Sequence, residues 1–78
     1  MHEIGVAKEI LNIVLDKAEG RKVTAISVQL GDDGHTTPES LTHAFAMVSQ
    51  GTIASGAKLS IAKVDTLESR VVDFDVEK

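Results

Sequence analysis

Cysteine is absent from this 78-residue chain, so it can form neither a disulfide nor a metal site built from thiolates. Tryptophan and tyrosine are absent too, and two phenylalanines leave a mainly aliphatic core. No apolar run reaches the roughly 18 residues of a membrane span, so we expect no membrane segment. Because no charged and then apolar leader opens the chain, we expect a reducing, cytoplasmic location.

The charge balance argues against nucleic acid as a partner. Eight basic residues against twelve acidic ones give a formal charge of -4, and the basic residues are scattered along the chain, so a phosphate backbone would be repelled. The composition, 42% hydrophobic and 26% charged, is typical of an ordinary folded domain. We therefore predict one domain over residues 1–78, and its small core makes a homodimer possible.

Hydrophobic periodicity predicts a first helix followed by a strand. Residues at helical spacing are Ile4, Ala7, Ile10, Leu11, Val14, Leu15 and Ala18. Gly20 suits the left-handed position that ends a helix. Residues 23–31 then alternate, as expected of a strand with one covered face: Ile26, Val28 and Leu30 share one side, and Ala25, Ser27 and Gln29 share the other.

A second helix is predicted to begin at Pro38. Thr37 offers a hydroxyl cap, Pro38 suits the first helical position, and Glu39 favours the positive end of the helix dipole. The expected buried residues are Leu41, Ala44, Phe45 and Val48, and the helix should stop near Gly51.

Two strands complete the predicted fold. Leu59 and Ile61 open the second strand, residues 65–69 form a turn, and Val72, Phe74 and Val76 alternate with acids in the third. The helical crossover makes the first two strands parallel, and the short link makes the third antiparallel to the second. The prediction is an α+β fold with two helices on one face of a small three-stranded mixed sheet, in the order helix-strand-helix-strand-strand.

Ten residues in one half of the chain form a single spaced pattern: Pro38-Glu39, Leu41, Ala44-Phe45, Gly51-Thr52, Gly56-Ala57 and Leu59. With the opening Met1-His2-Glu3, this pattern resembles the HypA/HybF family of nickel-insertion accessory proteins, which deliver nickel to hydrogenase and in some organisms urease. Leu30-Gly31-Asp32 and the acidic segment 72–77 also resemble family segments. The chain departs from the family at residues 33–35 and at His43, where an aromatic is common.

The resemblance implies the same element order as the nickel-binding domain of that family, in which a zinc ribbon is inserted between the last two strands. The ribbon uses four thiolates, and this chain has no cysteine. We therefore expect no zinc, with the insertion replaced by a turn near residues 65–69.

The resemblance also implies nickel bound at the N-terminus through His2, and the local chemistry allows it. The amine of Met1, the imidazole of His2 and the intervening backbone nitrogens can form fused chelate rings around a square-planar ion, a geometry that Ni(II) favours with nitrogen donors. Glu3 would offset the positive end of the helix dipole as electrostatic support. The predicted metal residues are thus Met1, His2 and Glu3, with Ni(II) as the ion.

Two other histidines are weaker metal candidates. His35 lies in the loop with Asp32 and Asp33, and it could supply an outside ligand if that loop approaches the N-terminus. A turn leading to the capped helix remains the favoured interpretation of the loop. His43 follows Glu39 by four residues, and an exposed ion pair is favoured over a shared metal.

The sequence does not indicate an enzyme. Residues 51–58 come close to a phosphate-binding loop, but Ala57 separates Gly56 from Lys58 and the context is helix-to-strand, so we expect the glycines to stop the helix and start the strand. Nucleophile motifs are missing as well. Two hypotheses remain: a nickel carrier that serves a nickel-handling GTPase and other hydrogenase maturation proteins, or a metal-independent interaction module that docks on such proteins.

Overall fold

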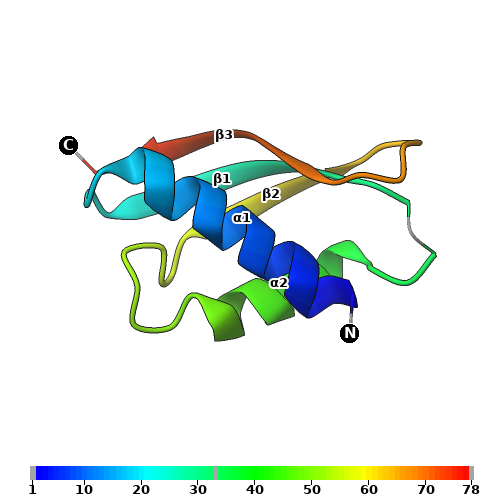
Figure 1. The fold of residues 1–78 in the computed structure, drawn as a ribbon, viewed down its shortest axis with the longest axis horizontal. Coiled ribbons are helices and arrows are strands. Elements are labelled where there is room, and N and C mark those ends of the chain that lie inside the picture. Colours follow the sequence, from blue (N-terminus) through cyan, green and yellow to red (C-terminus); the bar gives the residue numbers. More distant parts are fainter. Residues whose placement is uncertain (1, 33, 78) are drawn as a thin grey trace.

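The computed structural model describes residues 2–32 and 34–77, apart from the side chain of His2. Within this part of the chain the elements are α1 (His2–Ala18), β1 (Val23–Leu30), α2 (Pro38–Val48), β2 (Lys58–Lys63) and β3 (Arg70–Val76). The strands form a mixed sheet, and both helices lie against one of its faces (Figure 1). The predicted α+β class and element order are confirmed. None of the described helices is long and apolar enough to cross a membrane.

Both helices have the ends that the sequence predicts. Gly20 follows α1 with φ +81°, the left-handed conformation expected of a terminating glycine. At the start of α2, Thr37 accepts a hydrogen bond from the Ser40 N–H at 3.0 Å, and the Ser40 hydroxyl accepts one from the Thr37 N–H at 2.9 Å. This reciprocal capping box satisfies two amides that would otherwise lack partners at the helix start.

The strand order is β2-β1-β3, so β1 lies in the middle of the sheet. β2 pairs with β1 in parallel, as the crossover predicts, and β3 pairs with β1 antiparallel. The third strand therefore runs antiparallel to the second, but the two are not neighbours. The reason lies in the connection between them, which crosses the end of β1: the Val64 N–H donates to the Leu30 carbonyl at 2.9 Å, and the Asp32 N–H donates to the Thr66 carbonyl at 2.7 Å.

One residue of β3 faces the opposite way from the prediction. The ladder shifts register between Ser27, which pairs with Asp73, and Val28, which pairs with Val71. Val72 is the extra residue of this irregularity, and 51% of it is exposed, whereas Val71 packs against the core with Phe74 and Val76. Strict alternation fails here because a bulge places two residues of one strand opposite one residue of its partner.

The core lies between the sheet and the helices. Its buried apolar residues are Ala7, Ile10, Leu11, Val14, Ala18, Val23, Ile26, Val28, Leu30, Leu41, Ala44, Phe45 and Ala54. The predicted inner face of β1 is confirmed, since Ile26, Val28 and Leu30 are all at most 2% exposed. Burial of this apolar surface is what holds the two helices on the sheet.

The glycines between α2 and β2 have the structural role that the sequence predicts. Gly51 and Gly56 have φ values of +78° and +81°, which favour glycine. The Thr52 hydroxyl donates to the Ser49 carbonyl at 2.7 Å and accepts from the Ala54 N–H at 3.1 Å. This connection is therefore a compact turn that follows α2 and delivers the chain to β2.

Candidate metal centre

The candidate metal centre is the start of α1. His2 is the first residue of that helix, while Met1 and the side chain of His2 lie outside the described residues. The first four N–H groups of an α-helix have no carbonyl partner within the helix. The backbone nitrogens of His2 and Glu3 belong to this set, so a metal could bind them without breaking a hydrogen bond inside α1.

Glu3 lies where the start of α1 crosses α2. Its half-buried side chain lines a groove together with Ile4 of α1 and, from α2, Ser40, His43, Ala44 and Met47. The groove has a volume of about 290 Å³, and Met47 is 49% exposed beside it. Glu3 therefore places an acidic residue in the first turn of α1, on the side that faces α2.

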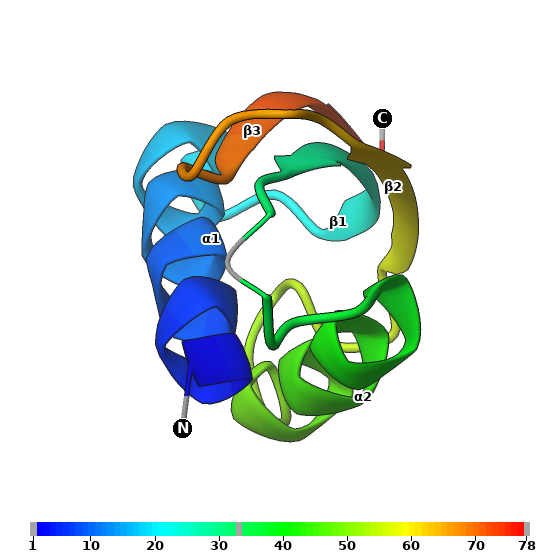
Figure 2. The same ribbon diagram turned by 90° about the vertical axis from the view of Figure 1, so that its right-hand side faces the viewer.

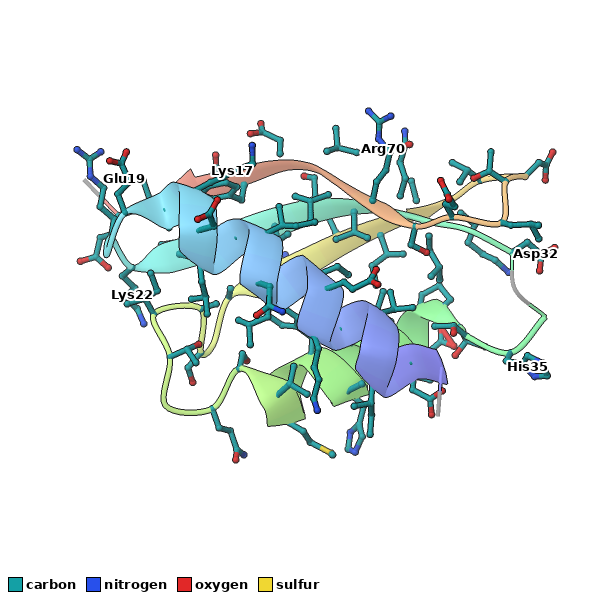
Figure 3. The ribbon with its side chains drawn as sticks, in the orientation of Figure 1. Lys17, Glu19, Lys22, Asp32, His35 and Arg70 are labelled. Atoms are coloured by element: carbon teal, nitrogen blue, oxygen red, sulfur yellow. The ribbon has the colours of Figure 1, made fainter. Side chains whose placement is uncertain are left out.

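Residues 31–32 and 34–37 lie at the same end of the fold as the start of α1 (Figures 1 and 2). His35 is exposed in this loop, and Figure 3 shows its side chain directed outward. The Asp32 carboxylate accepts a hydrogen bond from the Gly34 N–H at 3.2 Å, which fits the predicted turn. The structure thus places His35 and the helix start at one end, and a shared metal ion remains a prediction.

His43 and Glu39 are both exposed on α2 and line one groove together with β2. His43 also lines the groove that contains Glu3. Within the residues that the structure describes, no group of three or more His, Cys, Asp or Glu side chains is arranged to hold a metal ion.

Comparison with known proteins shows which family the chain belongs to. Residues 1–68 match the family described as "Hydrogenase/urease nickel incorporation, metallochaperone, hypA". The chain belongs to the HypA family. The match includes Met1-His2-Glu3 and ends just before β3 begins at Arg70, so the resemblance of residues 72–77 to a family segment stays a prediction.

Curated relatives in this family carry the name hydrogenase maturation factor HypA. The protein of Archaeoglobus fulgidus is 42% identical over 65 residues, which cover 80% of this chain and 59% of that protein. The protein of Methylocella silvestris is 41% identical, over an alignment that covers 78% of this chain and 57% of that protein. The protein of Geobacter sulfurreducens is 33% identical, over an alignment that covers 82% of this chain and 58% of that protein. The chain thus spans about three fifths of the length of these relatives.

The ten-residue pattern shared with the family is largely structural. Leu41, Ala44 and Phe45 are buried core residues of α2, and Thr37 with Pro38 starts that helix. Gly51, Thr52 and Gly56 shape the turn into β2. Sequence reasoning placed Ile4 on the apolar side of the first helix but did not single out Met47, although a methionine beside buried helical positions was the available signal. The chemical interest of the match therefore lies in the first three residues.

Proposed function

We propose that this chain binds Ni(II) at its N-terminus and passes the ion to proteins that mature nickel enzymes such as hydrogenase. The observation that carries the proposal is the family match, which begins at Met1-His2-Glu3 and continues through α1, β1, α2 and β2. Nickel is the cargo of such a protein, and transfer proceeds by ligand exchange. We propose the cytoplasm as its location and a nickel-handling GTPase among its partners.

The proposed ligands are the Met1 amine, the His2 imidazole and the backbone nitrogens between and beside them. These donors are consecutive in the chain, so they form small fused chelate rings and hold a square-planar ion. The start of α1 supports this arrangement because its amide nitrogens are not needed for helical hydrogen bonds. Each donor must lose a proton before or upon binding.

The charges around the start of α1 affect how tightly such a site holds a cation. The helix dipole places partial positive charge at the start of α1, which opposes Ni(II). The Glu3 carboxylate offsets that charge, and deprotonated amides offset it further. Glu3 is therefore proposed as a supporting residue, and His35 as a possible outside ligand from the neighbouring loop.

The connection between β2 and β3 is proposed to take the place of the family's zinc ribbon, so that residues 1–78 form one domain without zinc. Its hydrogen bonds to residues 30–32 close the fold at the point where the ribbon would be inserted.

Calorimetric titration of nickel into protein with a native, untagged N-terminus tests the proposed function. If nickel does not bind while maturation partners still do, the chain is an interaction module.

A further inference from the structure

A groove runs along the flank of the fold between α2 and β2. Its volume is about 600 Å³, and it is lined by Leu59 and Ile61 of β2 and by Pro38, Glu39, Thr42, His43 and Ala46 of α2. In the described part of the chain, β2 pairs with β1 and has no strand on its other side. Figure 2 shows β2 at the right-hand margin of the sheet, directly above α2. The groove therefore borders a free strand edge.

The two walls of this groove offer what an extended peptide needs. A free strand edge presents backbone donors and acceptors that another strand can pair with. Leu59 and Ile61 lie on the inner face of β2 and remain partly exposed, because they pack only at the margin of the core. Side chains at alternate positions of an added strand would lie over these residues and Ala46.

The segment that forms most of this flank, residues 40–64, is basic, whereas the whole chain has a net charge of -4. Residues 40–64 contain no acidic residue, although the chain has twelve, and they include Lys58 and Lys63 at the two ends of β2. Both lysines are exposed. Lys22 adds a cation near the start of β2, since its Nζ donates to the Ser55 carbonyl at 3.5 Å. The carboxylate among the groove residues is that of Glu39, at the start of α2.

We propose that this groove binds an extended acidic segment of a partner protein, which adds to β2 as a further strand. Apolar side chains at alternate positions would contact Leu59 and Ile61 on the inner face of β2, and carboxylates at the other positions would lie near Lys58 on its outer face. The site uses none of the N-terminal residues and goes beyond nickel binding.

Two capped peptides probe the groove in the absence of added metal: Glu-Val-Glu-Val-Glu-Val and its counterpart with lysine in place of glutamate. In a titration followed by amide chemical shifts, the acidic peptide should change the shifts of residues 39–46 and 58–63. It should also slow the exchange of amide hydrogens in β2. The lysine peptide should bind about tenfold more weakly, because its cations would lie beside Lys58.

Matched variants separate the groove from general charge effects. Lys58→Glu should weaken the affinity for the acidic peptide about fivefold or more. Lys8→Glu makes the same charge change on the exposed face of α1, and it should change that affinity less than about twofold. Ala46→Gln narrows the groove at an exposed helical position and should also weaken binding while circular dichroism stays native.

Three results would overturn the proposal. The first is equal binding of the two peptides, and the second is shift changes that map away from α2 and β2. The third is self-association that Lys58→Glu abolishes without any peptide binding, which would assign the groove to a second copy of the chain.

Discussion

The backbone of Gly31 lies directly against the backbone of Glu68. A β-carbon built on Gly31 would lie 2.7 Å from the carbonyl oxygen of Glu68 and 2.8 Å from its carbonyl carbon. The Gly31 N–H donates to the Ser69 hydroxyl at 2.8 Å, so the same residue fastens the connection that leads into β3. A side chain at position 31 would therefore push the connection at Leu67 and Glu68 away from the end of β1.

Replacing Gly31 with alanine should destabilise the protein by about 1–3 kcal/mol, since backbone atoms must shift to make room. Chemical denaturation measures this change. Gly5→Ala is the matched control, because a β-carbon at this helical position meets nothing within 4 Å and alanine favours helix by about 0.5–1 kcal/mol. Equal stability of the two variants would contradict the close approach of Gly31 and Glu68.

The cap of α2 gives a second prediction. Thr37→Ala removes the hydroxyl that accepts from the Ser40 N–H, so it should cost about 1 kcal/mol of unfolding free energy. Thr42→Ala is the control: the Thr42 hydroxyl donates to the Pro38 carbonyl within α2, and alanine is the better helix former there, so stability should hold or rise. Thermal unfolding of both variants checks the difference, and a neutral Thr37→Ala would argue against the capping box.

Removal of metal should leave the fold intact. The chain has no thiolate with which to build a zinc site, and its core consists of apolar side chains. We expect the same unfolding midpoint with and without a strong chelator, measured by circular dichroism. A cooperative loss of structure upon chelation would show that a metal ion contributes to folding.

The proposed nickel ligands predict how nickel binding depends on pH. Amine, imidazole and amide donors bind Ni(II) only without their protons, so protons compete with the ion. Nickel affinity should therefore fall as pH falls, and each binding event should release protons to the buffer. Calorimetry in buffers of different ionisation enthalpy counts these protons. Affinity that stays constant between pH 8 and about pH 6 would exclude nitrogen donors of this kind.

Much of the fold follows from local patterns, and the exceptions have physical causes. Helical spacing and the Thr37-Pro38 start are sufficient for α1 and α2, because both signals are local. The place of β3 beside β1 depends on contacts of Gly31 and Asp32 with residues 66–69, which no local pattern contains. The outward position of Val72 depends on a register shift that arises only when two strands meet.

The candidate site could be predicted in part. The family resemblance implied nickel at Met1-His2-Glu3, and the local chemistry allowed it because adjacent donors need no tertiary structure; this site stays a prediction. The position of Glu3 beside His43 could not be predicted, because it depends on how α1 crosses α2. The groove beside β2 was missed for the same reason, although the acid-free run 40–64 was visible in the sequence.

The central claim, nickel held at the N-terminus, is tested most directly by calorimetric titration of Ni(II) into four untagged proteins: the native chain, His2→Ala, His35→Ala and His43→Ala. His2→Ala should weaken binding sharply, because the imidazole and its chelate ring are lost together, while the other two changes should have much smaller effects. Glu3→Gln keeps the size of the side chain and should cost a few tenths to about 1 kcal/mol. Chemical blocking of the Met1 amine should also weaken binding, because it removes one donor of the proposed chelate. Equal nickel affinity of the native chain and His2→Ala would contradict the account.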